Sequence, residues 1–236
     1  MRKIVFWDFD GTLSHTGSIW GINVRDTMNE YADGVDLDTV RMHLRRGYTW
    51  QTPDVPYTET GDLWWEKLLL HISGLYDFYG IPKGKHAEIS AKIRARMISP
   101  DTYVLFEDAI DTLRECINLG AENYIISNNY PELPNVVMSL GVGEYISGYT
   151  VSAQIGFEKP HQGIFLHALS LANADITRDI CVMVGDNPAA DMEGGKNFGF
   201  TTVYAHKTKL ENPCEFADYY ASELREIPKI LCSHKS

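Results

Sequence analysis

Short apolar runs recur along much of the chain, bounded by glycine or polar residues, which is the pattern of buried strands. These runs occupy residues 3–7, 123–127, 180–185 and 200–204, with a weaker, edge-like run at 149–152. Segments typical of helices lie between them, at residues 108–119, 133–140, 162–172 and 189–198. Repeated strand-then-helix units predict an α/β fold, a Rossmann-like parallel sheet with helices on both faces.

A long segment near the N-terminus breaks this alternation and predicts only helices and loops. The expected helices cover residues 20–32, 37–46, 62–79 and 86–97. We interpret the segment as an inserted α-helical domain over residues 16–98, with the α/β core formed by residues 1–15 and 99–236. Beyond residue 206 the pattern is weaker, and residues 216–220 and 224–231 are expected to pack back on the core.

Composition narrows the choice of partners. The 236 residues carry a net charge of −11, which argues against nucleic acid as a partner because its phosphates need a basic surface. No apolar run reaches membrane-spanning length, and no signal-peptide core precedes the first strand. The four cysteines are widely spaced, as in reduced thiols, so we expect a cytoplasmic protein without membrane contact. The pattern says nothing about oligomeric state.

The first apolar run ends in two acids, Asp8 and Asp10, in the sequence Asp-Phe-Asp-Gly-Thr-Leu. Residues two apart in an extended chain point to the same side, so both carboxylates can share one small volume. A divalent cation relieves their repulsion, and oxygen ligands suit Mg²⁺. A calcium loop of the EF-hand type fits poorly, because the twelfth position, counting from Asp8, is Ile19 instead of Glu. A helix cap or surface acid pair is the structural alternative.

Other predicted strands also end in polar residues. Ser127 and Asn128 close the second strong run, Asp186 closes the third, and Lys159 stands just before a helix. Phosphoryl transfer needs a nucleophile, a metal, donors for the transferring oxygens and a proton carrier, and these residues supply one of each. Taken singly, they also fit a strand-end turn, a solvated lysine and helix-capping acids such as Asp186 and Asp191.

In their order along the chain, these segments resemble the four motifs of the haloacid dehalogenase-like hydrolase superfamily. The matching segments are Asp8-Phe9-Asp10-Gly11-Thr12, Ser127-Asn128, Lys159-Pro160 and Gly185-Asp186-Asn187-Pro188-Ala189-Ala190-Asp191. The resemblance implies that Asp8 attacks phosphorus, forms an aspartyl-phosphate and ligates Mg²⁺. It implies that Asp10 protonates the leaving oxygen, then activates water, and offers its backbone carbonyl to the metal.

The same resemblance assigns roles to the remaining residues. It implies that Ser127, Asn128 and Lys159 bind the substrate phosphate, and that Lys159 also offsets the charge of Asp8. It implies that Asp186 completes the metal site and that Asp191 supports it or contacts a metal-bound water. The helical insertion resembles a C1-type cap, which closes over the site and selects the substrate.

The function implied is a Mg²⁺-dependent phosphatase that hydrolyses a small phosphomonoester. A phosphomutase uses the same residues and stays open, as does a phospho-receiver or binding module, although receivers lack a large insertion. A dehalogenase is disfavoured because Asp10 is present. Within the insertion, a basic cluster is interpreted as a solvated helix face, with contact to a substrate anion as the alternative. At least two of three tryptophans are expected to pack in the helical core. His15, just after the first motif, is a candidate for contact with the substrate. The cluster is Arg41, His43, Arg45 and Arg46, and the tryptophans are Trp50, Trp64 and Trp65.

Overall fold

The computed structural model describes residues 1–15, 19–46 and 48–233. Within them, a six-stranded parallel sheet has the order β3-β2-β1-β4-β5-β6. The strands are β1 (Lys3–Trp7), β2 (Ala121–Ser127), β3 (Gly148–Val151), β4 (Ile180–Gly185), β5 (Thr201–Ala205) and β6 (Tyr219–Ala221). Because β1 pairs with both β2 and β4, the strand that carries the predicted nucleophile lies in the middle of the sheet.

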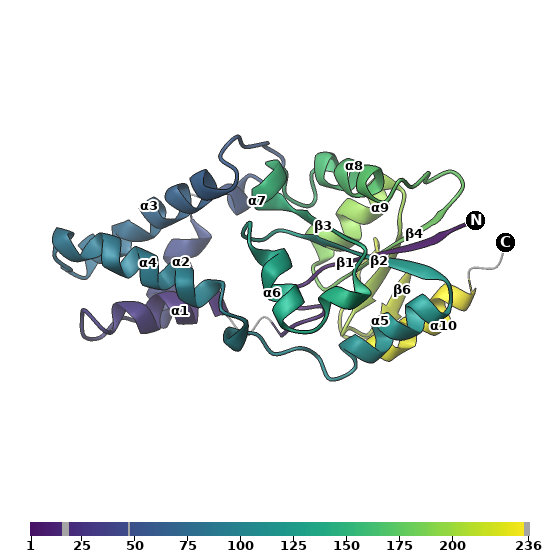
Figure 1. Ribbon diagram of the computed structural model, residues 1–236, viewed down its shortest axis with the longest axis horizontal. Helices are drawn as coiled ribbons and strands as arrows, with labels where there is room; N and C mark the ends of the chain where they lie inside the picture. The colour runs from purple at the N-terminus through teal and green to yellow at the C-terminus, as the bar shows by residue number, and fades with distance from the viewer. Residues whose placement is uncertain (16–18, 47, 234–236) are drawn as a thin grey trace.

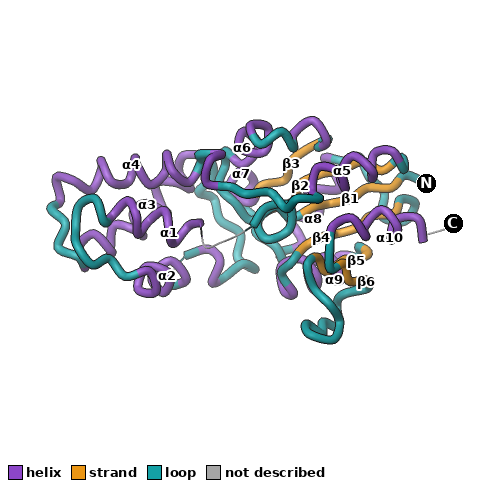
Figure 2. The backbone as a smooth tube through the Cα atoms, turned by 90° about the horizontal axis from the view of Figure 1, so that it is seen from below, coloured by secondary structure: helices purple, strands orange, loops and turns teal. Residues whose placement is uncertain are grey.

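Helices cover both faces of this sheet (Figures 1 and 2). Side chains alternate along β1, so Val5 points to the face of the sheet that is covered by α5 (Ala109–Asn118) and α10 (Ile227–Ser233). Phe6 packs on the opposite face, with α8 (Gln162–Leu171) and α9 (Gly194–Phe198). The short helices α6 (Leu133–Ser139) and α7 (Ser152–Ile155) follow β2 and β3.

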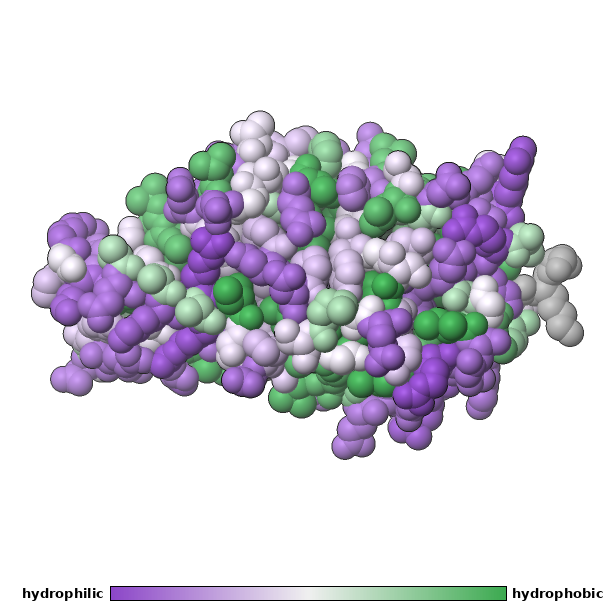
Figure 3. Space-filling view, viewed as in Figure 1, coloured by the Kyte–Doolittle hydropathy of each residue, from purple (hydrophilic) through white to green (hydrophobic). Residues whose placement is uncertain are grey.

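The helical domain lies beyond the carboxyl ends of the strands, displaced along the long axis in both views (Figures 1 and 2). Its helices are α1 (Ile19–Met28), α2 (Leu37–Arg45), α3 (Asp62–Phe78) and α4 (His86–Met97), with a 3₁₀ turn, η1 (Thr49–Gln51). Hydrophilic side chains dominate the end of this domain farthest from the sheet (Figure 3). Nowhere in the described ranges is a helix both long and apolar enough to cross a membrane.

The structure confirms the α/β class, the parallel sheet and the inserted helices, with several corrections to the expected elements. We expected no strand after the run at 200–204, but β6 extends the sheet; its three residues are too few to give an apolar pattern. Ser152 begins α7 instead of ending β3. The expected helix 189–198 begins at Pro188 as a π-helix, η5 (Pro188–Glu193), and α1 ends at Met28, before the expected 32.

The tryptophans of the helical domain are wholly or partly buried in its core. Trp64 and Trp65 are buried, as expected for at least two of the tryptophans, and Trp50 is half-buried. His43 is not simply solvated, because it stacks on His71 with ring centroids 4.4 Å apart. The predicted boundary between residues 15 and 16 adjoins residues 16–18, outside the described part of the chain.

Candidate active site

The carboxyl ends of β1, β2 and β4 meet at one cavity. The register places Trp7 beside Ile125 and Val184, so the residues that follow these strands converge. The backbone amide of Asp8 donates to the Val184 carbonyl at 2.9 Å and fixes the start of the loop. The cavity has a volume of 240 Å³. Its lining residues are Asp8, Asp10, Ser127, Asn128, Lys159, Asp186, Asn187 and Ala190.

Lys159 is buried and paired with two acids. Its ammonium nitrogen lies 2.8 Å from Asp8 Oδ1 and 2.6 Å from Asp191 Oδ1. Burial lowers the pKa of Lys159, but Asp191 and Asp8 more than offset that effect, so the pKa lies above its usual value. The lysine is therefore a fixed positive charge beside the Asp8 carboxylate, placed to hold an anionic group there.

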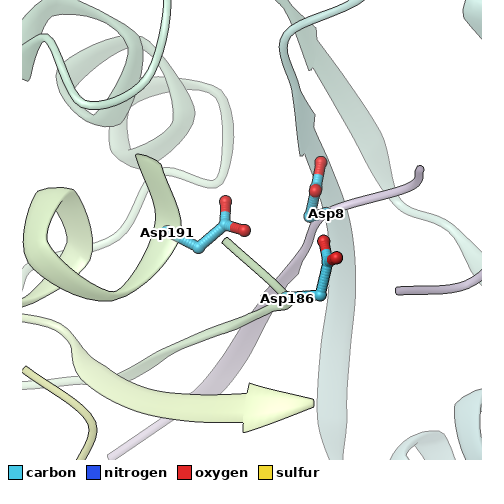
Figure 4. Close-up of side chains that lie close together, drawn as sticks. All are labelled: Asp8, Asp186 and Asp191. Atoms are coloured by element: carbon cyan, nitrogen blue, oxygen red, sulfur yellow. The ribbon is translucent and has the colours of Figure 1, made fainter. Parts of the chain in front are cut away.

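Three carboxylates form a group with the composition of a metal site. Asp8, Asp186 and Asp191 each offer an oxygen, and these oxygens lie within 4.8 Å of one another (Figure 4). Burial and the charge of Asp8 raise the pKa of Asp186 to about 6. Lys159 supplies one positive charge to these three acids, so the cluster still carries an excess of negative charge, and its oxygen ligands fit Mg²⁺, which binds through one or two carboxylates.

Two glycines keep this carboxylate group compact. A Cβ on Gly11 would lie 2.5 Å from Asp186 Oδ2, and a Cβ on Gly185 would lie 2.3 Å from Asp191 Cγ. Real Cβ atoms do not approach other atoms so closely, so each acid occupies space that only glycine leaves open. The sequence motifs around Asp10 and Asp186 thus contain glycine for a steric reason.

Asp10 lies in the same cavity but faces other partners. Its Oδ2 accepts a hydrogen bond from Asn129 Nδ2 at 2.9 Å, and its Oδ1 lies 3.5 Å from the Ser14 hydroxyl. Burial and then the charge of Asp8 raise its pKa to about 7. The Asp10 side chain is not part of the carboxylate group of Asp8, so a metal contact by Asp10 stays a prediction for its backbone carbonyl.

Asn128 and Asp191, both predicted as site residues, hold Lys159 in position. The amide of Asn128 holds the Lys159 backbone, donating to its carbonyl at 2.9 Å and accepting from its amide at 2.7 Å. Asp191 is fully buried behind the cavity; one oxygen accepts from Lys159 and the other from the Asn187 amide at 3.0 Å. Direct contact of Asn128 with phosphate, and of Asp191 with metal or water, stays a prediction.

Two residues of the region were missed. Asn129 orients Asp10 and directly follows Ser127-Asn128, so its place after a strand end was an available signal. Glu158 is buried beside Lys159 and gave no signal of its own. The His15 ring contacts that of Phe106 at an interplanar angle of 34°, with ring centroids 3.8 Å apart.

The parallel sheet and the acidic cavity at its carboxyl edge are those of a haloacid dehalogenase-like hydrolase, and the model of that family matches residues 2–199, so the chain belongs to it. The human "Haloacid dehalogenase-like hydrolase domain-containing protein 3" is 26% identical, over 84% of this chain and 79% of its own. A glyceraldehyde 3-phosphate phosphatase of Pyrococcus furiosus is 26% identical, over 97% of this chain and 92% of its own. A 2-haloacid dehalogenase structure from Pseudomonas syringae pv. Tomato DC3000 has a TM-score of 0.72 at 20% identity, with all of both chains covered, and shows the fold alone.

Proposed function

We propose that this hydrolase is a Mg²⁺-dependent phosphatase that cleaves a small phosphomonoester through an aspartyl-phosphate on Asp8. The observation that carries the proposal is the pairing of the Asp8 carboxylate with Lys159 in a cavity that also holds Asp10. Phosphoryl transfer depends on positioning and on charge placed around the transferring oxygens, and this cavity offers both.

Asp8 is the nucleophile in this mechanism. Its carboxylate oxygen attacks phosphorus, the bond from phosphorus to the leaving oxygen breaks, and a mixed anhydride forms on Asp8. Lys159 and the Ser127 hydroxyl hold the phosphoryl oxygens, with Asn128 and Asp191 keeping Lys159 in place. Water then attacks the phosphorus and regenerates the Asp8 carboxylate.

Asp10 carries the proton. A carboxyl whose pKa is about 7 is protonated part of the time at neutral pH, so it can donate to the leaving oxygen and afterwards accept the proton of the attacking water. Asn129 keeps the Asp10 side chain turned away from the carboxylate group. A dehalogenase has no leaving alcohol to protonate, so this arrangement supports phosphoester chemistry.

Asp8 and Asp186, with the backbone carbonyl of Asp10, are the residues that would hold Mg²⁺. When bound, the ion supplies positive charge that offsets the repulsion between Asp8 and an incoming phosphate. The chain carries a net charge of −11, so a local positive field of this kind is needed to bring an anion to the site.

Release of inorganic phosphate from a panel of small phosphomonoesters tests the proposal, with and without Mg²⁺. We expect release to need the metal, and Asp8→Asn to lower kcat/KM by about 1,000-fold or more. Asp33→Asn, which removes an exposed acid, is the matched control. Isomerised phosphate esters in place of free phosphate would indicate a mutase. Halide release from 2-haloacids without phosphate release would contradict the proposal.

A further inference from the structure

A second cavity, of 250 Å³, lies between the helical domain and the carboxyl end of the sheet. Asn128 lines both this cavity and the one that holds Asp8, so the two adjoin. The other walls include Trp20 of α1, Trp50 of η1 and Trp64 of α3. A substrate whose phosphate occupies the first cavity therefore has its leaving group directed toward the second.

The aromatic walls stand at right angles. The ring of Trp20 lies 6.2 Å from that of Trp50 at an interplanar angle of 79°, and 6.1 Å from that of Trp64 at 80°. Trp20 and Trp50 are half-buried, so part of their surface is open to a ligand. Tryptophan faces bind flat, apolar groups by stacking, and a corner of perpendicular rings offers a face to one side of such a group and an edge to another.

Glu158 gives this apolar cavity a polar element. The residue is 5% exposed and lines the cavity. Its Oε1 accepts a hydrogen bond from the Thr49 hydroxyl at 2.6 Å, whereas Oε2 is buried without a partner. A buried acceptor left unpaired costs free energy, and a ligand that donates a hydrogen bond removes that cost. The cavity thus selects for an N–H or O–H donor next to an apolar face.

We propose that the second cavity binds a flat nitrogen heterocycle with an N–H donor, and that the substrate is a nucleoside 5′-monophosphate. This rests on the proposed phosphatase function. The base stacks on Trp50, meets the perpendicular ring of Trp20 along its edge and donates to Glu158 Oε2, as carboxylates accept from base edges. The sugar spans Asn128. A sugar phosphate has no flat π-system to stack on the tryptophans, and an alkylammonium group would meet the Arg45 guanidinium, which also lines the cavity.

The test compares AMP, GMP, CMP and UMP with ribose 5-phosphate, which has the same phosphate and sugar but no base. We expect kcat/KM for at least one nucleotide to exceed that for ribose 5-phosphate by about 10-fold or more. Trp50→Ala should lower this ratio about 10-fold, and Glu158→Gln should lower it for the preferred base. Phe78→Ala, an exposed aromatic on α3, is the control and should leave the ratio unchanged.

Calorimetry on the Asp8→Asn protein with Mg²⁺ separates the two proposals, because binding needs no turnover. Tighter binding of a nucleotide than of ribose 5-phosphate by about 10-fold supports the inference even if no substrate releases phosphate, an outcome that overturns only the phosphatase function. Equal kcat/KM and equal binding for nucleotides and ribose 5-phosphate overturn the inference and leave the phosphatase function in place. A preference for phosphocholine or phosphoethanolamine over every nucleotide also overturns it.

Discussion

Gly11 shows how a single position controls the site. Its φ is +88°, and a Cβ there would lie 2.5 Å from Asp186 Oδ2. We expect Gly11→Ala to displace the Asp186 carboxylate and to weaken Mg²⁺ binding by about 10-fold or more, the usual effect of disturbing the support of a metal ligand. Calorimetric titration of Mg²⁺ into the variant and the wild type measures the difference.

Gly34→Ala is the matched control for this substitution. Gly34 has a φ of +71°, and a Cβ there would meet nothing within 4 Å. Gly34→Ala introduces the same backbone strain as Gly11→Ala, which lowers the free energy of unfolding by about 1–2 kcal/mol, but it makes no clash with Asp186. Unchanged Mg²⁺ affinity in both variants would show that the steric argument for Gly11 is wrong.

At the same scale, the sequence predicted residue types better than residue contacts. Asp8, Asp10 and Lys159 were identified because each stands at the end or start of an element, and the structure places all three in one cavity. The pairing of Lys159 with Asp191 was not predicted. It depends on how η5 packs against β4, which is a tertiary property. Asn129 was missed although it directly follows Asn128, because its contact with Asp10 depends on the direction of the Asp10 side chain.

Among the elements, β6 is attached through its pairing with β5 and through the side chain of Asp218. Asp218, just before β6, accepts a hydrogen bond from the Thr202 amide at 3.0 Å, donates its own amide to Thr202 Oγ1 at 3.1 Å and pairs with Lys196. Partial burial raises the pKa of Asp218, but Lys196 and the Thr202 amide outweigh it, so the pKa lies below its usual value. The folded state therefore favours the ionised form of Asp218.

A carboxyl whose pKa is lowered in the folded state stabilises the protein above its unfolded-state pKa. That stabilisation is lost as the pH falls through the folded-state pKa. We expect Asp218→Asn to lower the free energy of unfolding by about 1–2 kcal/mol at pH 7, and by progressively less below about pH 4. Urea denaturation of the variant and the wild type, at pH 7 and at values below pH 4, measures the loss of unfolding free energy at each pH. Glu215→Gln, an exposed acid nearby, is the control, and a loss that does not change with pH would contradict the ionic role.

Element prediction succeeded where burial gave a strong pattern. The runs that became β1, β2 and β4 are apolar because these central strands are covered on both faces. Edge strands carry less of this signal, so β3 was weak in the sequence and β6 gave none. The π-helical start of η5 had no signature, because Pro188 and the Asn187 cap are typical of an ordinary helix start.

For the whole molecule, the insertion was visible as a break in strand–helix alternation, but its seating on the core was not. Glu132, just before α6 in the α/β core, provides one of the contacts. Its Oε2 accepts from Trp65 Nε1 at 2.8 Å, and its Oε1 pairs with Arg94 at 2.5 Å. Both partners belong to the helical domain, so one carboxylate joins α3 and α4 to the core. Other contacts between the two domains are the hydrogen bond of Thr49 with Glu158, at the tryptophan-lined cavity, and two backbone hydrogen bonds of 2.9 Å, from Tyr57 to Gly156 and from Gly61 to Ala153.

Glu132→Ala should therefore loosen the helical domain without unfolding the sheet. The variant leaves the buried Trp65 indole N–H without its acceptor, at a cost of about 1–3 kcal/mol. Hydrogen exchange is expected to quicken in α3 and α4 while β1 and β4 keep their protection, because local opening draws on the weaker contacts. Glu107→Ala, an exposed acid of the core, should change neither. Equal acceleration throughout the sheet would mean that the two domains unfold as one unit, and that Glu132 supports global stability instead of the seating of the helical domain over the site.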